Sequence, residues 1–205
     1  MVQDDFTIEV WLKTVSSRVG QYFYHGTSIT FADVSATGSM DFSLAVLNSK
    51  FVMNIGWPDV EITSATTVTT GDWVHVAGTR TRATGDFQIF VNGQLEASGV
   101  NHTGALDATP IISVGCWASA DAALDGLLDE LKIWETVRTP AEIDAGMHLA
   151  LTGNEPGLVG YYRFDDMGGS QLLDSSSQGN HGTVAGTILP VSSNAPGCNG
   201  SGGAP

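Results

Sequence analysis

The sequence predicts an all-β protein, an antiparallel sandwich with one short helix. Short segments in which apolar and polar residues alternate recur from the N-terminus onward. The chain is rich in Val, Ile and Thr, which favour strands, and its 25 glycines suit an all-β protein with many turns. The spacing of these segments and the turn residues between them are typical of an antiparallel sandwich rather than of alternating strands and helices.

The expected strands follow one another along the chain. In Phe6–Lys13 the even positions are all apolar and the odd ones mostly polar. Asn92-Gly93 joins Asp86–Val91 to Gln94–Ala97 and is the best short-range hairpin signal in the sequence. The other segments with strand patterns are Gln21–Phe31, Asp41–Leu47, Phe51–Ile55, Trp73–Thr79, Ile111–Cys116, Gly126–Trp134, Gly157–Phe164 and the short apolar stretch Thr187–Val191.

One helix is expected, after the strand Gly126–Trp134. Thr139 suits the N-cap, Pro140 the first helical position, and Glu142 completes a capping box. Residues spaced by four then form one apolar face, and a glycine supplies the stop; they are Ile143, Met147, Leu151 and Gly153. We expect this helix to dock against the edge of the sandwich as a lid.

The charge balance restricts the partners. The chain has 22 acidic and 8 basic side chains, a formal net charge of −14 at pH 7. Such a chain cannot neutralise a run of phosphates, which argues against nucleic acid, and it disfavours an anionic membrane surface. No segment reaches the roughly 18 apolar residues of a membrane span. The balance suits a highly soluble protein or one that binds cations.

Only 15% of the 205 residues are charged, against roughly 25% in ordinary globular proteins. The polar surface must therefore consist mostly of Ser, Thr, Asn and Gly, a composition that suggests a secreted or cell-surface protein. We expect one domain over residues 1–196 and a Gly/Ser-rich tail or linker over 197–205. The two cysteines, Cys116 and Cys198, either bridge the tail to the body or stay unpaired, because their geometry cannot be read from sequence.

Asp129 is the first candidate site residue. As a strand, Gly126–Trp134 places Asp129 on the same face as Leu131 and Ile133, so an acid lies on an apolar face. A buried carboxylate is costly unless it is hydrogen-bonded or bound to a cation. Two interpretations stay open: a structural Asp that accepts backbone N–H bonds, and a calcium ligand.

The second candidate is the loop Asp174–Gly182, which is dense in oxygen donors and contains two glycines. It is either an ordinary Asx-turn loop or, if it meets Asp129 in space, part of a cation site. No catalytic residue is expected. Asp129 and Glu130 are neighbours on a strand and should point to opposite faces, whereas glycoside hydrolysis needs two carboxyls that flank one bond.

Two tryptophans in loop-like segments are candidates for ligand binding. Trp57 and Trp117 either stack on a sugar or pack in the core, whereas Trp11, Trp73 and Trp134 fall in strands and are expected in the core. Tyr161 and Tyr162 alternate on a strand, so only one of them can face the core.

Taken together, these segments resemble the laminin-G-like, concanavalin A-like jelly-roll domains, the superfamily that includes pentraxins and many carbohydrate-binding domains. The resemblance covers roughly residues 6 to 196. The residues that carry it are Phe6–Trp11, Gly71–Ala77, Phe90–Gly93, Ile112–Gly115, Gly126–Trp134 with Arg138–Ile143, Gly157–Asp165 and Asp174–Gly182. In many members the segment similar to 157–190 precedes the one similar to 6–134, so this chain is either permuted or begins part-way through a repeat.

The resemblance implies a two-sheet jelly roll that binds rather than catalyses, often with a structural calcium ion. By position it implies calcium ligands at Asp129, Asp174 and Asn180. We therefore expect a non-catalytic extracellular binding module, stabilised by Ca²⁺, that binds glycans and belongs to a larger multidomain protein. The alternative is a cell-adhesion module that binds an extracellular protein and no sugar, and a glycan-cleaving enzyme is the least favoured class.

Overall fold

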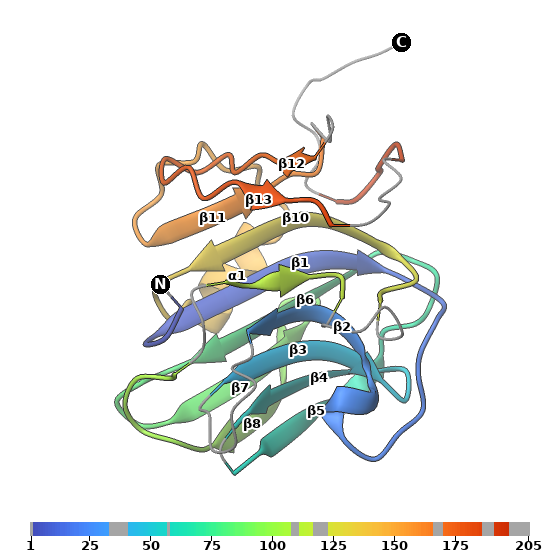
Figure 1. Cartoon of the computed structure of the whole chain (residues 1–205), viewed down its shortest axis with the longest axis vertical. Coiled ribbons are helices and arrows are strands. Elements are labelled where there is room, and N and C mark those ends of the chain that lie inside the picture. The colour runs from blue at the N-terminus through green and yellow to red at the C-terminus, as the bar shows by residue number, and fades with distance from the viewer. Residues whose placement is uncertain are drawn as a thin grey trace.

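Two antiparallel sheets face each other in the computed structural model (Figure 1). The structure describes residues 2–32, 41–56, 58–107, 111–116, 123–165, 170–185 and 191–196. One sheet has six strands in the order β11 (Leu158–Tyr162), β10 (Leu127–Trp134), β1 (Phe6–Lys13), β6 (Val74–Arg80), β7 (Asp86–Val91) and β8 (Gln94–Val100). The other has five, in the order β5 (Val60–Thr67), β4 (Lys50–Ile55), β3 (Phe42–Leu47), β2 (Thr27–Ala32) and β9 (Ser113–Val114).

Three smaller elements complete the fold. They are the 3-10 helix η1 (Phe23–His25), the α-helix α1 (Pro140–Gly146) and the strand pair β12 (Gln171–Leu172) with β13 (Gly182–Thr183). The all-β sandwich with one short α-helix that the sequence predicts is therefore confirmed. Among the described residues, no helix has the length and apolar character that crossing a membrane requires.

The core lies between the sheets and follows from the alternation in the strands. In β1 the residues Phe6, Ile8, Val10 and Leu12 are fully buried and belong to the main core cluster. The ring of Phe6 packs on that of Phe42 from β3, with centroids 4.6 Å apart. Each fully buried side chain of this size contributes about 1.5–3 kcal/mol to folding, so this two-sided core explains why the sandwich forms.

The hairpin predicted at Asn92-Gly93 is confirmed. Asn92 has φ of 49° and Gly93 has φ of 76°, the left-handed conformations that a two-residue turn between twisted strands requires. The strand expected over Gln21–Phe31 is correct only in its second half. Its first half forms η1, where the backbone N–H of His25 donates to the carbonyl of Tyr22 and closes a tight turn.

Two further strand predictions differ from the structure. β9 is limited to Ser113–Val114 within the segment Ile111–Cys116 that was expected to be a strand. Strand β5 was not predicted, although Val60 and Ile62 alternate in it and pack against the core cluster. Of the expected stretch Thr187–Val191, residues 187–190 lie outside the described residues.

The helix α1 has the predicted capping box. Glu142 accepts a hydrogen bond from the backbone N–H of Thr139 at 2.7 Å, and the Thr139 hydroxyl accepts from the N–H of Glu142. The helix ends at Gly146 with Met147 as its C-cap, earlier than the expected stop at Gly153. Side chains of the six-stranded sheet bind the carbonyls at and just after this end of the helix. Lys132 Nζ donates to the carbonyls of Gly146 and Leu149.

The helix docks on a sheet face rather than on the sandwich edge. Ile143 of α1 packs with Ala77 of β6 and Phe90 of β7 on the outer face of the six-stranded sheet, the face turned away from the other sheet. Figure 1 shows α1 behind this sheet and the five-stranded sheet in front. The two sheets therefore present different outer faces: the helix packs on one of them, and η1 and its flanking loop lie against the other.

Candidate functional site

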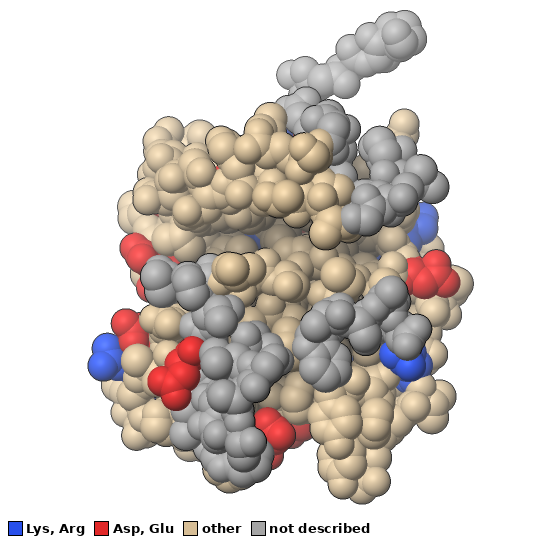
Figure 2. All heavy atoms as spheres, in the orientation of Figure 1, with Lys and Arg blue, Asp and Glu red and all other residues tan. Residues whose placement is uncertain are grey.

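A row of mainly uncharged polar side chains crosses the outer face of the five-stranded sheet. The strand registers align five residues across all five strands. In the order of the strands they are Ser113, Phe31, Ser43, Asn54 and Glu61. They share this face because their neighbours Phe42 and Leu44 in β3, and Met53 in β4, point inward to the core. In the view of Figure 2, which looks onto this face, the charged side chains lie mostly towards its margins.

The loop that contains η1 holds an aromatic pair at one end of this row. The rings of Tyr22 and Tyr24 stack with centroids 5.3 Å apart and an angle of 19° between their planes. Both are exposed, Tyr22 by 47% and Tyr24 by 42%. Nδ1 of His25 accepts the backbone N–H groups of Gln21 and Tyr22, each at 3.3 Å, which holds the loop in place. Stacked tyrosines that stay exposed are available to a ligand.

Gly26 brings this loop close to the sheet. A Cβ at this position would lie 2.9 Å from the carbonyl oxygen of Val46 and 2.9 Å from that of Phe23. Only glycine allows this approach, because both neighbours are backbone atoms that cannot give way. The close approach positions Phe23 and Tyr24 over the sheet.

A small hollow lies between η1 and the sheet, and we call it the η1 hollow. Its lining residues come from η1, β2 and β3. They are Phe23, Tyr24, Gly26, Ser28, Phe31, Ser43 and Ala45. The hydroxyl oxygens of Ser28 and Ser43 are buried and have no hydrogen-bond partner. Next to Ser43 in the row, Oδ1 of Asn54 is also buried without a partner. Of the nine buried side-chain N or O atoms without a partner in the described part of the chain, these three lie on this face.

Glu61 closes the row on β5 beside η1. Burial raises the pKa of its carboxyl above the usual value, although hydrogen bonds from the backbone of Phe23 and the side chain of Thr63 act to lower it. None of the residues that line the η1 hollow is a Lys or an Arg. The electrostatic character of this end of the face is therefore neutral to acidic.

The two residues that the sequence predicts to bind a ligand, Trp57 and Trp117, lie outside the described residues. The sequence analysis missed Tyr22, Tyr24, Ser28 and Ser43 instead. One signal was present: the run Tyr22-Phe23-Tyr24-His25-Gly26 has no apolar and polar alternation, which argues for a loop that displays aromatic rings rather than for a strand.

The loop Asp174–Gly182 is organised around the Asp174 carboxylate. Oδ1 accepts the N–H groups of Tyr161 and Ser176, each at 2.8 Å. Oδ2 accepts the N–H of Asn180 at 2.8 Å and the hydroxyl of Ser176 at 2.7 Å. Burial acts to raise the pKa of Asp174, but these hydrogen bonds outweigh it and hold the pKa below its usual value.

This arrangement does not fit a calcium ion at Asp174 as it stands. A carboxylate has about four lone-pair positions, and four donors already occupy those of Asp174. The loop does bring Asn180 to Asp174, but through the Asn180 backbone, and the Asn180 side chain donates to the carbonyl of Val159 at 2.8 Å. Within the described ranges, no three His, Cys, Asp or Glu side chains gather closely enough to hold a metal ion.

Asp129 is buried, but not on the face that the sequence predicted. β10 contains a bulge, and Glu130 in it has φ of 52°. Before the bulge, Asp129 pairs with Trp11 on the outer face; after it, Leu131 belongs to the core cluster. The extra residue shifts the alternation by one position, so the expectation that Asp129 and Leu131 share a face is wrong.

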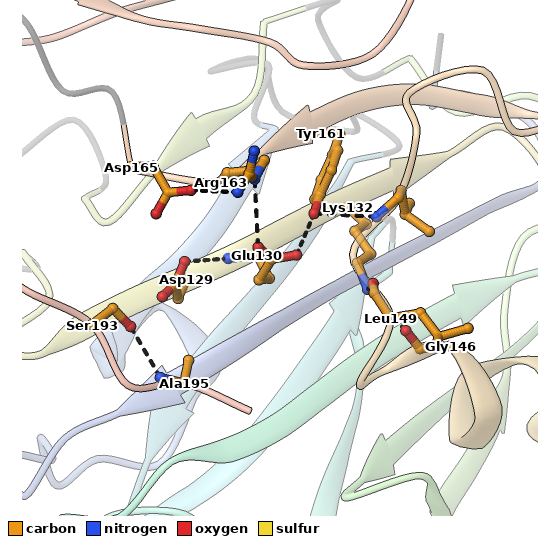
Figure 3. Close-up of polar contacts among 11 residues, drawn as sticks. Asp129, Glu130, Lys132, Gly146, Leu149, Tyr161, Arg163, Asp165, Ser193 and Ala195 are labelled. Carbon is orange, nitrogen blue, oxygen red and sulfur yellow. Dashed lines mark hydrogen bonds and ion pairs between the residues drawn. The ribbon is translucent and has the colours of Figure 1, made fainter. Parts of the chain in front are cut away.

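Because of the same bulge, the prediction that Asp129 and Glu130 point to opposite faces is also wrong. Figure 3 shows both side chains on the side of the sheet that α1 covers. Oδ1 of Asp129 accepts the backbone N–H of Glu130 at 2.8 Å. Oε2 of Glu130 accepts the hydroxyl of Tyr161 at 2.5 Å, and Nε of Arg163 lies 3.9 Å from its Oε1. Burial raises the pKa of Glu130 despite these partners.

Further buried polar groups continue this network beneath α1. Glu9 pairs with Lys132 across the strands, its Oε2 lies 3.2 Å from Nε2 of His75, and its Oε1 accepts the indole N–H of Trp134 at 2.9 Å. Trp11 donates its indole N–H to the carbonyl of Met147 at 2.9 Å. Trp11 and Trp134 are therefore buried as expected, but on the outer face of the six-stranded sheet, beneath α1 and the segment after it, rather than between the two sheets. The network ties α1 and the segment after it to the sheet.

The structure also tests the predictions for the two neighbouring tyrosines, for Trp73 and for the cysteines. Tyr162 packs against the core cluster, whereas Tyr161 packs with Trp134 and Leu158 on the opposite face, so only one of the two faces the core, as predicted. The prediction that Trp73 lies in a strand and in the core is wrong: it is half-buried just before β6, and its indole N–H donates to Oδ1 of Asn194. Cys116 has no disulfide among the described residues, and Cys198 lies outside them, so their pairing stays a prediction.

A second hollow lies at Asp4, Asp5, Arg82 and Glu135. Its acidic groups are engaged within the protein: Arg82 forms an ion pair with Asp4 at 3.1 Å, and the backbone N–H of Arg82 donates to Asp5 at 2.7 Å. Nothing in it matches the combination of aromatic rings and unpaired hydroxyls beside η1. The η1 hollow and the polar row are therefore the better candidate site.

Comparison with known proteins agrees with this architecture. Residues 1–144 match the family profile described as Concanavalin A-like lectin/glucanases superfamily. No curated protein matches the chain. A structure from Bacteroides ovatus, provisionally named a carbohydrate binding protein, is 20% identical with a TM-score of 0.69. The match covers 93% of this chain and 54% of that one, so the chain spans about half the length of that protein.

Two other solved structures share the fold. The pentraxin of Limulus polyphemus is 14% identical with a TM-score of 0.55, and the match covers 69% of each chain. Domain 4 of an extracellular arabinanase from Geobacillus stearothermophilus, solved in complex with arabinotriose, is 21% identical with a TM-score of 0.54. That match covers 71% of this chain and 67% of the other. At these identities the likeness concerns the fold.

Proposed function

Because the chain belongs to the concanavalin A-like lectin/glucanases superfamily, we propose that it is a non-catalytic module that binds carbohydrate. The observation that carries this proposal is the outer face of the five-stranded sheet. It combines exposed stacked aromatic rings with a row of mainly neutral polar side chains, of which Ser43 and Asn54 are buried. Sites for small hydroxylated ligands commonly pair flat aromatic surfaces with a few placed polar groups. Two of the similar structures are named for carbohydrate binding or were solved with arabinotriose.

The buried carboxylates support binding rather than catalysis. Glu9, Asp129 and Glu130 are each at most 2% exposed, in the network beneath α1 and the segment that follows it. A glycosidase needs two carboxyl groups that reach the same sugar bond from an accessible cleft. The η1 hollow has no carboxylate among its lining residues.

Titration with a panel of oligosaccharides tests the proposal. The panel contains arabinotriose, because a similar domain was solved with it, together with xylan, glucan and galactan fragments and sialyllactose. We expect saturable binding of at least one sugar by calorimetry or by NMR chemical shifts, in the micromolar to millimolar range. No binding at millimolar concentration across the panel would contradict the proposal. Release of reducing ends from any of these glycans would contradict its non-catalytic part.

Protein–protein adhesion is the second candidate. Val15 is 78% exposed and Val19 88% exposed, in the loop that leads to Tyr22. Exposed apolar side chains beside exposed aromatics are typical of protein contacts. A partner protein retained by the wild type but lost on Val19→Asp, with no sugar bound, would favour adhesion. A secreted or cell-surface location and a place within a larger protein remain part of the main proposal; the match to about half of the Bacteroides ovatus protein supports the latter.

Calcium remains a separate hypothesis for Asp129, Asp174 and Asn180. The hydrogen bonds to Asp174 compensate its charge without an ion. Elemental analysis of the purified protein, together with melting in the presence and absence of chelator, tests the hypothesis directly.

A further inference from the structure

We propose that the η1 hollow receives a single hydroxyl group of a neutral sugar whose ring packs against Tyr24, and that the site rejects acidic sugars. This inference rests on the proposed function and adds to it a position and a charge class. Four observations support it: two unpaired serine hydroxyls, the size of the hollow, the aromatic rings at its rim and the charges around it.

The serine hydroxyls supply the polar part. Ser28 is 5% exposed and Ser43 is 2% exposed, and both side chains line the hollow. Neither Oγ has a hydrogen-bond partner. They come from adjacent strands and lie on the same outer face, since Ser28 pairs with Ala45, two residues from Ser43 on β3. A hydroxyl of a ligand can both donate and accept, so one such group is able to satisfy two serines.

The hollow is small, with space at its centre for a group about the size of one water molecule. A whole sugar ring does not fit inside it, but a single hydroxyl group does. The ring would then remain at the rim. The hollow therefore recognises one substituent of a sugar rather than enclosing the sugar.

The rim offers flat apolar surfaces for such a ring. Tyr24 is 42% exposed and lines the hollow together with Phe23 and Phe31. Tyr22 stacks on Tyr24, with ring centroids 5.3 Å apart, and supports its orientation. The apolar C–H groups of a sugar ring pack on an aromatic face while its hydroxyl groups point to water or to polar side chains.

The charges around the hollow select against acidic sugars. None of the seven lining residues is ionised at neutral pH. Glu61, the acid at the end of the row, lies beside the backbone of Phe23, and the whole chain carries a net charge of −14. A sialic acid or uronic acid carboxylate would meet repulsion here and would find no Lys or Arg among the lining residues to pair with.

The decisive experiment pairs each neutral sugar with its acidic counterpart. Lactose is compared with sialyllactose, and a neutral galactan trimer with trigalacturonate, alongside arabinotriose, by calorimetry at low and at physiological salt. We expect the bound sugars to be neutral, and each acidic counterpart to bind at least tenfold more weakly. Binding of the acidic sugar alone would overturn the inference but leave carbohydrate binding intact.

Two variants locate the site. Tyr24→Ala should weaken binding of the neutral sugar about tenfold or more, and Ser43→Ala about three- to tenfold, the range expected for a lost hydrogen bond. Ser43→Ala should leave the melting temperature unchanged, because its hydroxyl has no partner in the protein. The matched controls are Leu95→Ala and Ser98→Ala, exposed residues of β8 on the other sheet, which should bind like the wild type.

The outcomes separate this inference from the function on which it rests. If the wild type binds a neutral sugar and both Tyr24→Ala and Ser43→Ala bind it equally well, the η1 hollow is not the site. The carbohydrate-binding function then stands. If the wild type binds no sugar at all, the proposed function fails and this inference fails with it.

Discussion

The hydroxyl of Tyr161 donates a hydrogen bond to Oε2 of Glu130 at 2.5 Å, and this contact joins β11 to the bulge in β10. Both side chains are buried, Tyr161 completely and Glu130 to 98%, so water cannot replace either partner. Burial raises the pKa of both groups, since each loses hydration of its charged form. The contact, together with Arg163 at 3.9 Å from Oε1, gives this buried carboxyl two side-chain partners within the protein.

Removing the donor of this pair should cost more stability than removing a similar donor at the surface. Tyr161→Phe is expected to lower the free energy of unfolding by about 1.5–3 kcal/mol, because it leaves a buried carboxyl with one partner fewer. The control is Tyr162→Phe, whose hydroxyl donates to the carbonyl of Asn180 in an exposed contact. Urea denaturation measures both. A larger loss for Tyr162→Phe would show that the Glu130 contact is not important for stability.

Asp174 should stabilise the fold through hydrogen bonds alone. Asp174→Ala removes the acceptor of four of them and is expected to cost about 3 kcal/mol. The loss should be the same in calcium and in chelator. Asp165→Ala is the control, because its ion pair with Arg163 is partly exposed and should contribute at most about 1 kcal/mol. A loss that appears only when calcium is present would instead support the calcium hypothesis.

The two buried acids should respond to pH in opposite directions. The pKa of Asp174 is lowered in the folded state, so its stabilisation is present above its unfolded pKa of about 3.9 and is lost as the pH falls through the lowered value. The pKa of Glu130 is raised, so its contribution is largest below its unfolded pKa of about 4.3 and declines as the pH rises above that value.

Paired variants measure these opposite slopes. The stability difference between wild type and Asp174→Asn should shrink as the pH is lowered from 6 to 3, whereas that between wild type and Glu130→Gln should grow over the same range. Chemical denaturation at several pH values supplies the numbers. Parallel slopes for the two variants would contradict the assigned environments.

Lys132 should hold the segment after α1 on the sheet. Lys132→Met keeps the length and apolar stem of the side chain but removes its hydrogen bonds to the carbonyls of Gly146 and Leu149; the Gly146 carbonyl keeps the backbone N–H of Leu149 as a donor. It also removes a positive charge that helps to keep the pKa of Glu9 low, besides the hydrogen bond and charge of His75. We expect a loss of about 2–4 kcal/mol.

Hydrogen exchange locates this effect. Amides of residues 140–151 should exchange faster in Lys132→Met than in the wild type, while those of β3 and β4 should change little. Lys50→Met is the matched control, because Lys50 donates to the carbonyl of Ala65 at the exposed end of β4. Unchanged exchange over 140–151 would show that another group holds the segment.

By itself the sequence determined the sandwich, most of its strands, the hairpin turn and the start of the helix. These features depend on neighbours in the chain. Alternation in Phe6–Lys13 produces a strand with one apolar face, Asn92-Gly93 accepts the turn conformation, and Thr139 with Glu142 caps the helix within one turn.

Only the tertiary structure decided where the site residues point. The bulge at Glu130 moves Asp129 to the outer face, and it is recognised only when β10 is paired with β1. Likewise, the hydroxyls of Ser28 and Ser43 lie in one hollow because β2 and β3 pair in a particular register and Gly26 brings η1 onto them. Register and bulges are properties of strand pairs, so a pattern within one strand cannot reveal them.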